Sequence, residues 1–162
     1  MEILALAQKM ELEGKAYYER LAGETEVAQL KGVFTFLAEQ EQKHYDLFTA
    51  IEKGAAPAAI DEDTTLGDKV KELFGMCSAS FSLPEAVYDY QAAYGKALEM
   101  ENASVKLYTD LAAGVDTAGK KTVDFIIAQE ESHVRLIESM IEFVGNTKSW
   151  LENAEWRHID AY

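Results

Sequence analysis

The 162-residue chain contains one cysteine, two prolines, and 15 basic side chains against 29 acidic ones. With Cys77 alone, these residues can form neither an internal disulfide nor a four-cysteine zinc or iron site. A formal charge of −14 leaves no basic stripe to neutralise phosphates, which argues against nucleic acid as a partner. Apolar runs are short and interrupted by charge, so we expect no membrane-spanning helix. No signal peptide is evident, and we expect a cytoplasmic location.

Apolar residues make up 48% of the chain and charged residues 27%, which suits one globular domain. Apolar residues recur at helical spacing in four long segments, at about residues 3–22, 25–53, 82–113 and 116–144. Glycines follow these segments and predict their ends, at Gly23, Gly54, Gly114 and the pair Gly145-Asn146. The predicted fold class is therefore all-α.

The connection between the second and third segments is much longer than the other two. A helix of about 28 residues is about 42 Å long, and an extended chain returns along it in roughly 12 residues. The connection at 54–83 is long enough for this, so the second and third helices are predicted to be parallel. This gives a ferritin-like four-helix bundle with one long crossover, over residues 1–145. The tail at 146–162 is predicted to form a short helix that packs on the bundle or on a partner.

The two halves of the chain repeat one another, which predicts a pseudo-two-fold bundle of two helical hairpins. Met10-Glu11 aligns with Met100-Glu101 without a gap as far as Ala22 and Ala112. After removal of one residue between helices, the second helix of each half aligns as well. Each half reads Glu-x6-Tyr and then Glu-x-x-His, with these residues in register: Glu11 and Glu101, Tyr18 and Tyr108, Glu41 and Glu130, His44 and His133.

The repeated Glu-x-x-His motifs indicate a metal site. Residues three apart on a helix share one face, so each Glu and His can reach a single point. Their neighbours are apolar, and an unpaired carboxylate there would cost several kcal/mol or take up a proton. Two divalent ions would neutralise four inward carboxylates, and iron or manganese suits this ligand set well, zinc acceptably. The predicted ligands are Glu11, Glu41, His44, Glu101, Glu130 and His133.

A single Glu-x-x-His is a weak signal, because Glu155 and His158 have the same spacing in the tail without a partner segment. We interpret that third pair as structural or at most a surface site. Tyr18 and Tyr108 lie about two turns beyond their glutamates and on the same face. They are either core aromatics or candidate catalytic groups whose hydroxyls hydrogen-bond a ligand carboxylate or pass electrons.

The segments MELEGKAYY and MENASVKLY, with EQKH and EESH, resemble the rubrerythrin branch of the ferritin-like superfamily. The resemblance implies that Glu11 and Glu101 are terminal ligands and that Glu41 and Glu130 bridge two irons. It also implies that His44 and His133 each bind one iron. The single cysteine excludes the rubredoxin module of rubrerythrins in the strict sense. Leu98 and Ser104 stand where the family commonly has a further carboxylate on the third helix.

By this resemblance, the expected function is reduction of hydrogen peroxide or dioxygen at a di-iron centre, in defence against oxidative stress. Electrons would come from an external donor protein. Ferrous iron oxidation of the ferritin type, a non-catalytic metal-binding or partner-binding bundle, and substrate oxygenation remain alternatives. The apolar tail with Trp150 and Trp156 predicts a homodimer, although both could instead cover one end of their own bundle.

Overall fold

The computed structural model describes residues 2–55 and 91–159 of the chain. These residues form four helices: α1 (Glu2–Glu24), α2 (Ala28–Glu52), α5 (Gln91–Ala112) and α6 (Thr117–Ile159). The greater part of the predicted crossover and the start of the third predicted helix lie outside the described residues. Among the helices described, none is both long and apolar enough to span a bilayer.

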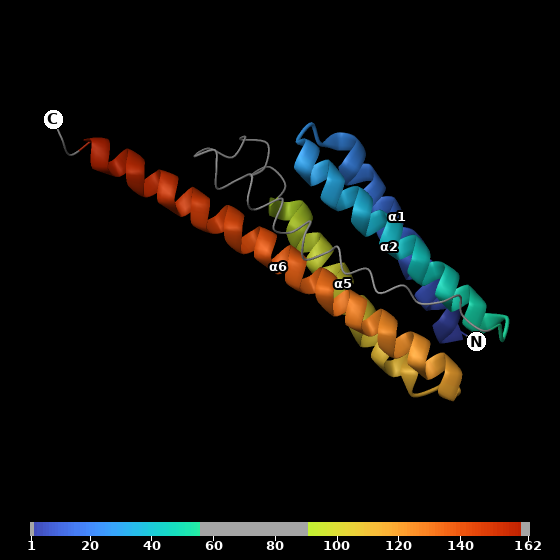
Figure 1. Ribbon diagram of the computed structural model, residues 1–162. Helices are drawn as coiled ribbons and strands as arrows, with labels where there is room; N and C mark the ends of the chain where they lie inside the picture. The colour runs from blue at the N-terminus through green and yellow to red at the C-terminus, as the bar shows by residue number, and fades with distance from the viewer. Residues whose placement is uncertain (1, 56–90, 160–162) are drawn as a thin grey trace.

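The helices form two antiparallel hairpins, α1 with α2 and α5 with α6, that pack together as a four-helix bundle (Figure 1). The turn between α1 and α2 lies at the opposite end of the bundle from the turn between α5 and α6. As a result α2 and α5 run in the same direction, while α1 and α5 are antiparallel. Both the all-α fold class and the parallel arrangement of the second and third helices are confirmed.

Most helix ends fall within two residues of their predicted positions. Gly54 has a φ of 62°, the left-handed conformation that stops α2 after Lys53. Asp116 precedes α6, and its Oδ1 accepts a hydrogen bond of 2.7 Å from the backbone N–H of Gly119. This side-chain cap satisfies one of the free N–H groups in the first turn of α6.

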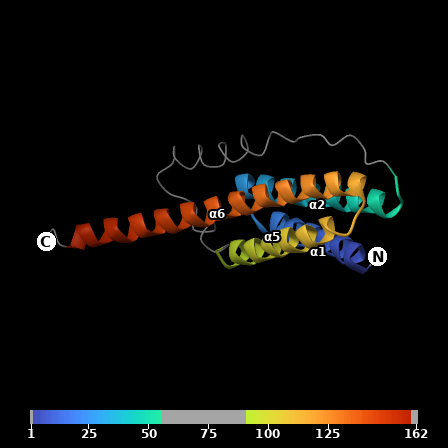
Figure 2. The same cartoon turned by 90° about the horizontal axis from the view of Figure 1, so that it is seen from below.

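The predicted helix end at Gly145-Asn146 is wrong. Helix α6 continues through this pair to Ile159, and its distal part projects beyond the other three helices (Figures 1 and 2). Gly145 does not adopt a positive φ, so it acts as an interior helical residue. Glycine costs only about 1 kcal/mol more than alanine there. The side chains of Trp150 and Trp156 lie outside the described part of the structure, so tail packing and the homodimer stay predictions.

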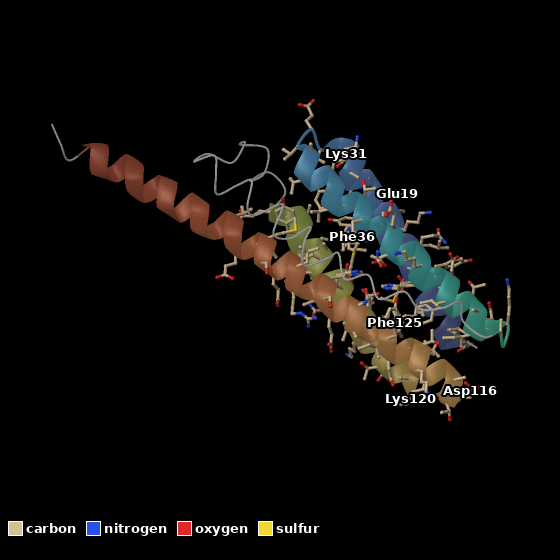
Figure 3. All side chains as sticks on the ribbon, in the orientation of Figure 1. Glu19, Lys31, Phe36, Asp116, Lys120 and Phe125 are labelled. Atoms are coloured by element: carbon tan, nitrogen blue, oxygen red, sulfur yellow. The ribbon has the colours of Figure 1, made fainter. Side chains whose placement is uncertain are left out.

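The apolar core consists of two clusters at different levels along the bundle. One contains Phe34, Leu37 and Ile137, and the other contains Phe48 and Ile126. Figure 3 shows Phe36 on α2, which belongs to the first cluster, and Phe125 on α6, which packs against the second. On each of the four helices, the predicted metal ligands lie in sequence between residues of the two clusters. The fold therefore places a buried polar layer between two apolar ones.

Candidate metal centre

All six predicted ligands are in the buried polar layer. They come from all four helices, because α1 and α5 each supply one glutamate and α2 and α6 each supply a glutamate and a histidine. None of the six is more than 4% exposed: Glu11, Glu41, His44, Glu101, Glu130 and His133.

The ligand candidates form two overlapping groups. Within each group, one candidate ligand atom of every residue lies within 4.8 Å of those of the others. The first group consists of Glu11, Glu41, His44 and Glu130, and the second of Glu41, Glu101, Glu130 and His133. We call the two places the Glu11–His44 position and the Glu101–His133 position. Since Glu41 and Glu130 belong to both groups, the arrangement is consistent with a dinuclear metal site with two shared carboxylates.

The candidate ligand atoms of this site are arranged for metal binding rather than for hydrogen bonds with one another. Both oxygens of Glu130 and both ring nitrogens of each histidine are buried without a hydrogen-bond partner in the described residues. The His44 Nδ1 atom lies 2.9 Å from Glu130 Oε1, and the His133 Nδ1 atom lies 3.3 Å from Glu130 Oε2. Unpaired polar atoms in an apolar core cost several kcal/mol. Convergent carboxylate oxygens and imidazole nitrogens are, in contrast, good ligands for divalent transition metals.

The carboxylates change the ionisation of both histidines in the metal-free protein. Burial alone would lower the pKa of His44, but the charges of Glu130 and Glu11 raise it to about 10. Burial likewise opposes protonation of His133, and Glu101 and Glu130 raise its pKa to about 9. Both imidazoles are therefore protonated at neutral pH and must lose these protons to bind a metal.

The carboxylates differ in the direction in which their pKa values are shifted. Burial, followed by repulsion from Glu130 and other carboxylates, raises the pKa of Glu41 well above its usual value. Burial and Glu130 raise the pKa of Glu101 to about 8. Burial also acts to raise the pKa of Glu130, but the positive charge of His44 and the close approach of His133 hold it well below the usual range. Glu130 thus carries a negative charge close to both protonated histidines.

The tyrosines of the repeat bind the glutamates of the opposite half. Tyr18 on α1 donates a hydrogen bond to Glu101 Oε1 on α5. Tyr108 on α5 donates one of 2.6 Å to Glu11 Oε1 on α1. Burial and the nearby carboxylates raise the pKa of both phenols, so they remain protonated donors. Each hydroxyl leaves the second oxygen of its glutamate available, and this fixes the orientation of the carboxylate.

Gly14 is a site residue that the sequence reasoning missed. A Cβ atom at this position would lie 2.8 Å from Glu41 Oε2, closer than side chains tolerate. The only signal in the sequence is a glycine in the interior of a long helix, where it is unfavourable without a packing reason. The side chains of Glu155 and His158 lie outside the described residues, so our interpretation of that pair stays untested.

The fold and the buried site define a helical bundle of the ferritin-like type with a Glu/His dinuclear metal site. Residues 2–141 match the family model described as Rubrerythrin, and the chain belongs to the rubrerythrin family. Comparison with curated proteins and with solved structures found no significant match. A rubredoxin module is not evident in the 162 residues, which contain one cysteine.

Proposed function

We propose that the protein binds two iron ions per chain and reduces hydrogen peroxide or dioxygen to water with electrons from an external donor. One observation carries this proposal: the two buried ligand groups share Glu41 and Glu130, and most of their convergent donor atoms, including both oxygens of Glu130 and all ring nitrogens of the two histidines, are without hydrogen-bond partners in the described residues. Such a site binds two adjacent ions and neutralises their charge with carboxylates. Membership of the rubrerythrin family supports a redox role over a purely structural metal.

In this proposal the chain supplies ligand geometry and an apolar environment. Tyr18 and Tyr108 fix the carboxylates of Glu101 and Glu11. The two apolar clusters exclude bulk water above and below the polar layer. When iron is bound, it supplies the redox chemistry and the protein tunes it through this environment.

In this proposal the electrons come from outside these 162 residues. Reduction of one hydrogen peroxide molecule to two water molecules consumes two electrons and two protons. The chain's one cysteine cannot hold an iron–sulfur or rubredoxin centre that would deliver these electrons. We therefore include a separate electron-donor protein in the proposal.

Anaerobic loading with two ferrous ions per chain, followed by titration with hydrogen peroxide, tests the function. We expect consumption of about one peroxide per pair of irons, with growth of near-ultraviolet and visible absorption as the irons are oxidised. The Glu41→Gln variant, treated in the same way, is the control for free ferrous iron. Equal reaction in both proteins would contradict the proposal. Oxidation of many more irons than two per chain, with mineral deposition, would favour ferroxidase activity instead.

A further inference from the structure

A cavity of about 110 Å³ lies between α1 and α5 and is partly open. Ala103 and Glu13 line it and are exposed, so they form its mouth. Glu41 and Glu101 line it as well, and both are buried. The cavity therefore connects the surface of the bundle with ligands of the metal site.

The cavity meets only one side of the nearly symmetric site. Its lining includes Glu101 and Tyr18, the hydrogen-bonded pair at the Glu101–His133 position. Their counterparts in the repeat, Glu11 and Tyr108, do not line it, and neither histidine does. The two metal positions, although equivalent in ligand type, thus differ in their access to this space.

A difference within the repeat accounts for this asymmetry. Gly14 lies three residues after Glu11, and Ser104 lies three residues after Glu101. Gly14 lines the cavity directly beside Glu41, where even a Cβ atom would collide with Oε2. Ser104 is only 8% exposed, and its hydroxyl interacts with the hydroxyl of Tyr108. Both residues line the cavity: the glycine leaves space next to Glu41, while the serine carries a side chain whose hydroxyl bonds Tyr108.

We propose that small ligands enter through this cavity and reach the Glu101–His133 position, while the Glu11–His44 position is closed to them. The inference rests on the proposed dinuclear metal site. The chemical class is a small ligand, such as peroxide, dioxygen or azide, which a cavity of about 110 Å³ accommodates.

Azide binding to the cobalt-loaded protein tests this assignment without measurement of turnover, because the visible absorption of cobalt(II) reports changes in its ligands. Cobalt content is measured first, and fewer than two ions per chain would contradict the metal site itself. With two ions present, a crystal structure of the azide complex locates the ligand. We expect azide at the Glu101–His133 position, with its free end in the cavity. Azide at the Glu11–His44 position, or no azide at all, would overturn this inference alone.

Substitutions at the mouth provide a kinetic test of the same path. Ala103→Phe places a large side chain at the mouth, on a residue that is no ligand. Ala128→Phe, at an exposed site on α6 that does not line the cavity, is the matched control. We expect azide association to be at least tenfold slower in the first variant and unchanged in the second. Equal rates in both would exclude this route.

Ser104→Gly tests the explanation of the asymmetry. Because Ser104 lines the cavity and bonds Tyr108, removal of its side chain should extend the cavity toward Tyr108. We expect the variant to bind a second azide, at the Glu11–His44 position. A single azide with wild-type location would show that Ser104 does not close that side.

Discussion

Tyr108 on α5 donates a buried hydrogen bond of 2.6 Å to Glu11 on α1, across the boundary between the two helical hairpins. The bond links a residue from each half of the repeat, and Tyr18 makes the reciprocal bond to Glu101. Direct contacts between α1 and α5 are much sparser than those within either hairpin. These two bonds therefore both orient metal ligands and connect the halves of the bundle.

Tyr108→Phe should destabilise the metal-free protein by about 1–3 kcal/mol, because a buried hydrogen bond to a carboxyl group is lost. It should also weaken metal binding, since Glu11 loses its fixed orientation. Chemical denaturation and metal titration measure the two effects. Tyr17→Phe is the matched control, because Tyr17 bonds the backbone oxygen of Ala93 on α5 at 2.9 Å, away from the ligands. A Tyr108→Phe protein with unchanged metal affinity would show that the bond serves the fold alone.

Glu41 and Glu130 share the same place in the repeat but should respond differently to substitution. The raised pKa of Glu41 favours its neutral form without metal, so Glu41→Gln should change the free energy of unfolding of the metal-free protein less than a substitution of Glu130 does. Glu130→Gln removes the counter-charge of His44 and should cost about 3 kcal/mol. Denaturation of both variants in the presence of a chelator gives the comparison. Equal costs would contradict the assignment of the charge to Glu130.

The metal-free protein should lose stability as the pH rises. The pKa of His44 is raised from 6.5 to about 10 and that of His133 to about 9. Their stabilisation is fully present below the unfolded value near 6.5 and is lost as the pH rises through 9 to 10. The raised pKa of Glu101 also makes the stability fall with rising pH, between pH 4.5 and about pH 8. We expect a lower free energy of unfolding at about pH 9.5 than at about pH 7 with chelator present. A flat or rising profile would argue against the protonated histidines.

Gly14→Ala should impair metal binding, because the new Cβ atom would displace the carboxylate of Glu41. Gly32 provides the control, since it lies exposed in α2 and a Cβ atom there would have nothing within 4 Å. Gly32→Ala should raise stability by about 0.5–1 kcal/mol through helix propensity alone. Metal titration and thermal unfolding of both variants separate the effects. Wild-type affinity in Gly14→Ala would mean that Glu41 moves aside without consequence.

The sequence was sufficient to predict the bundle and the residues that gather at its centre. Helical spacing identified the four helices, and the register of the repeat brought the two Glu-x-x-His motifs and their partner glutamates together. Gly54 was a reliable stop signal because its φ of 62° is needed for the turn. Gly145 was not, because nothing after it forces the chain away from the helix.

Features that depend on how the two halves face each other could not be predicted. Spacing placed Tyr18 on the face of Glu11, but its hydroxyl meets Glu101, because α1 and α5 are antiparallel and each tyrosine reaches the level of the opposite glutamate. Met10 and Met100 align in the repeat, but their half-buried places along the cavity wall depend on how α1 and α5 meet. The space beside Gly14 depends on how closely Glu41 of α2 approaches, and the sequence of α1 alone does not reveal this distance.

The metal content of the purified protein tests the central claim most directly, with the Glu41→Ala/Glu130→Ala double variant measured beside it. The account predicts two metal ions per wild-type chain after loading and removal of excess metal. It predicts none in the double variant, because both shared carboxylates are gone. Circular dichroism establishes that the double variant remains helical. Fewer than one ion per two wild-type chains, or two tightly bound ions in the double variant, would contradict the account.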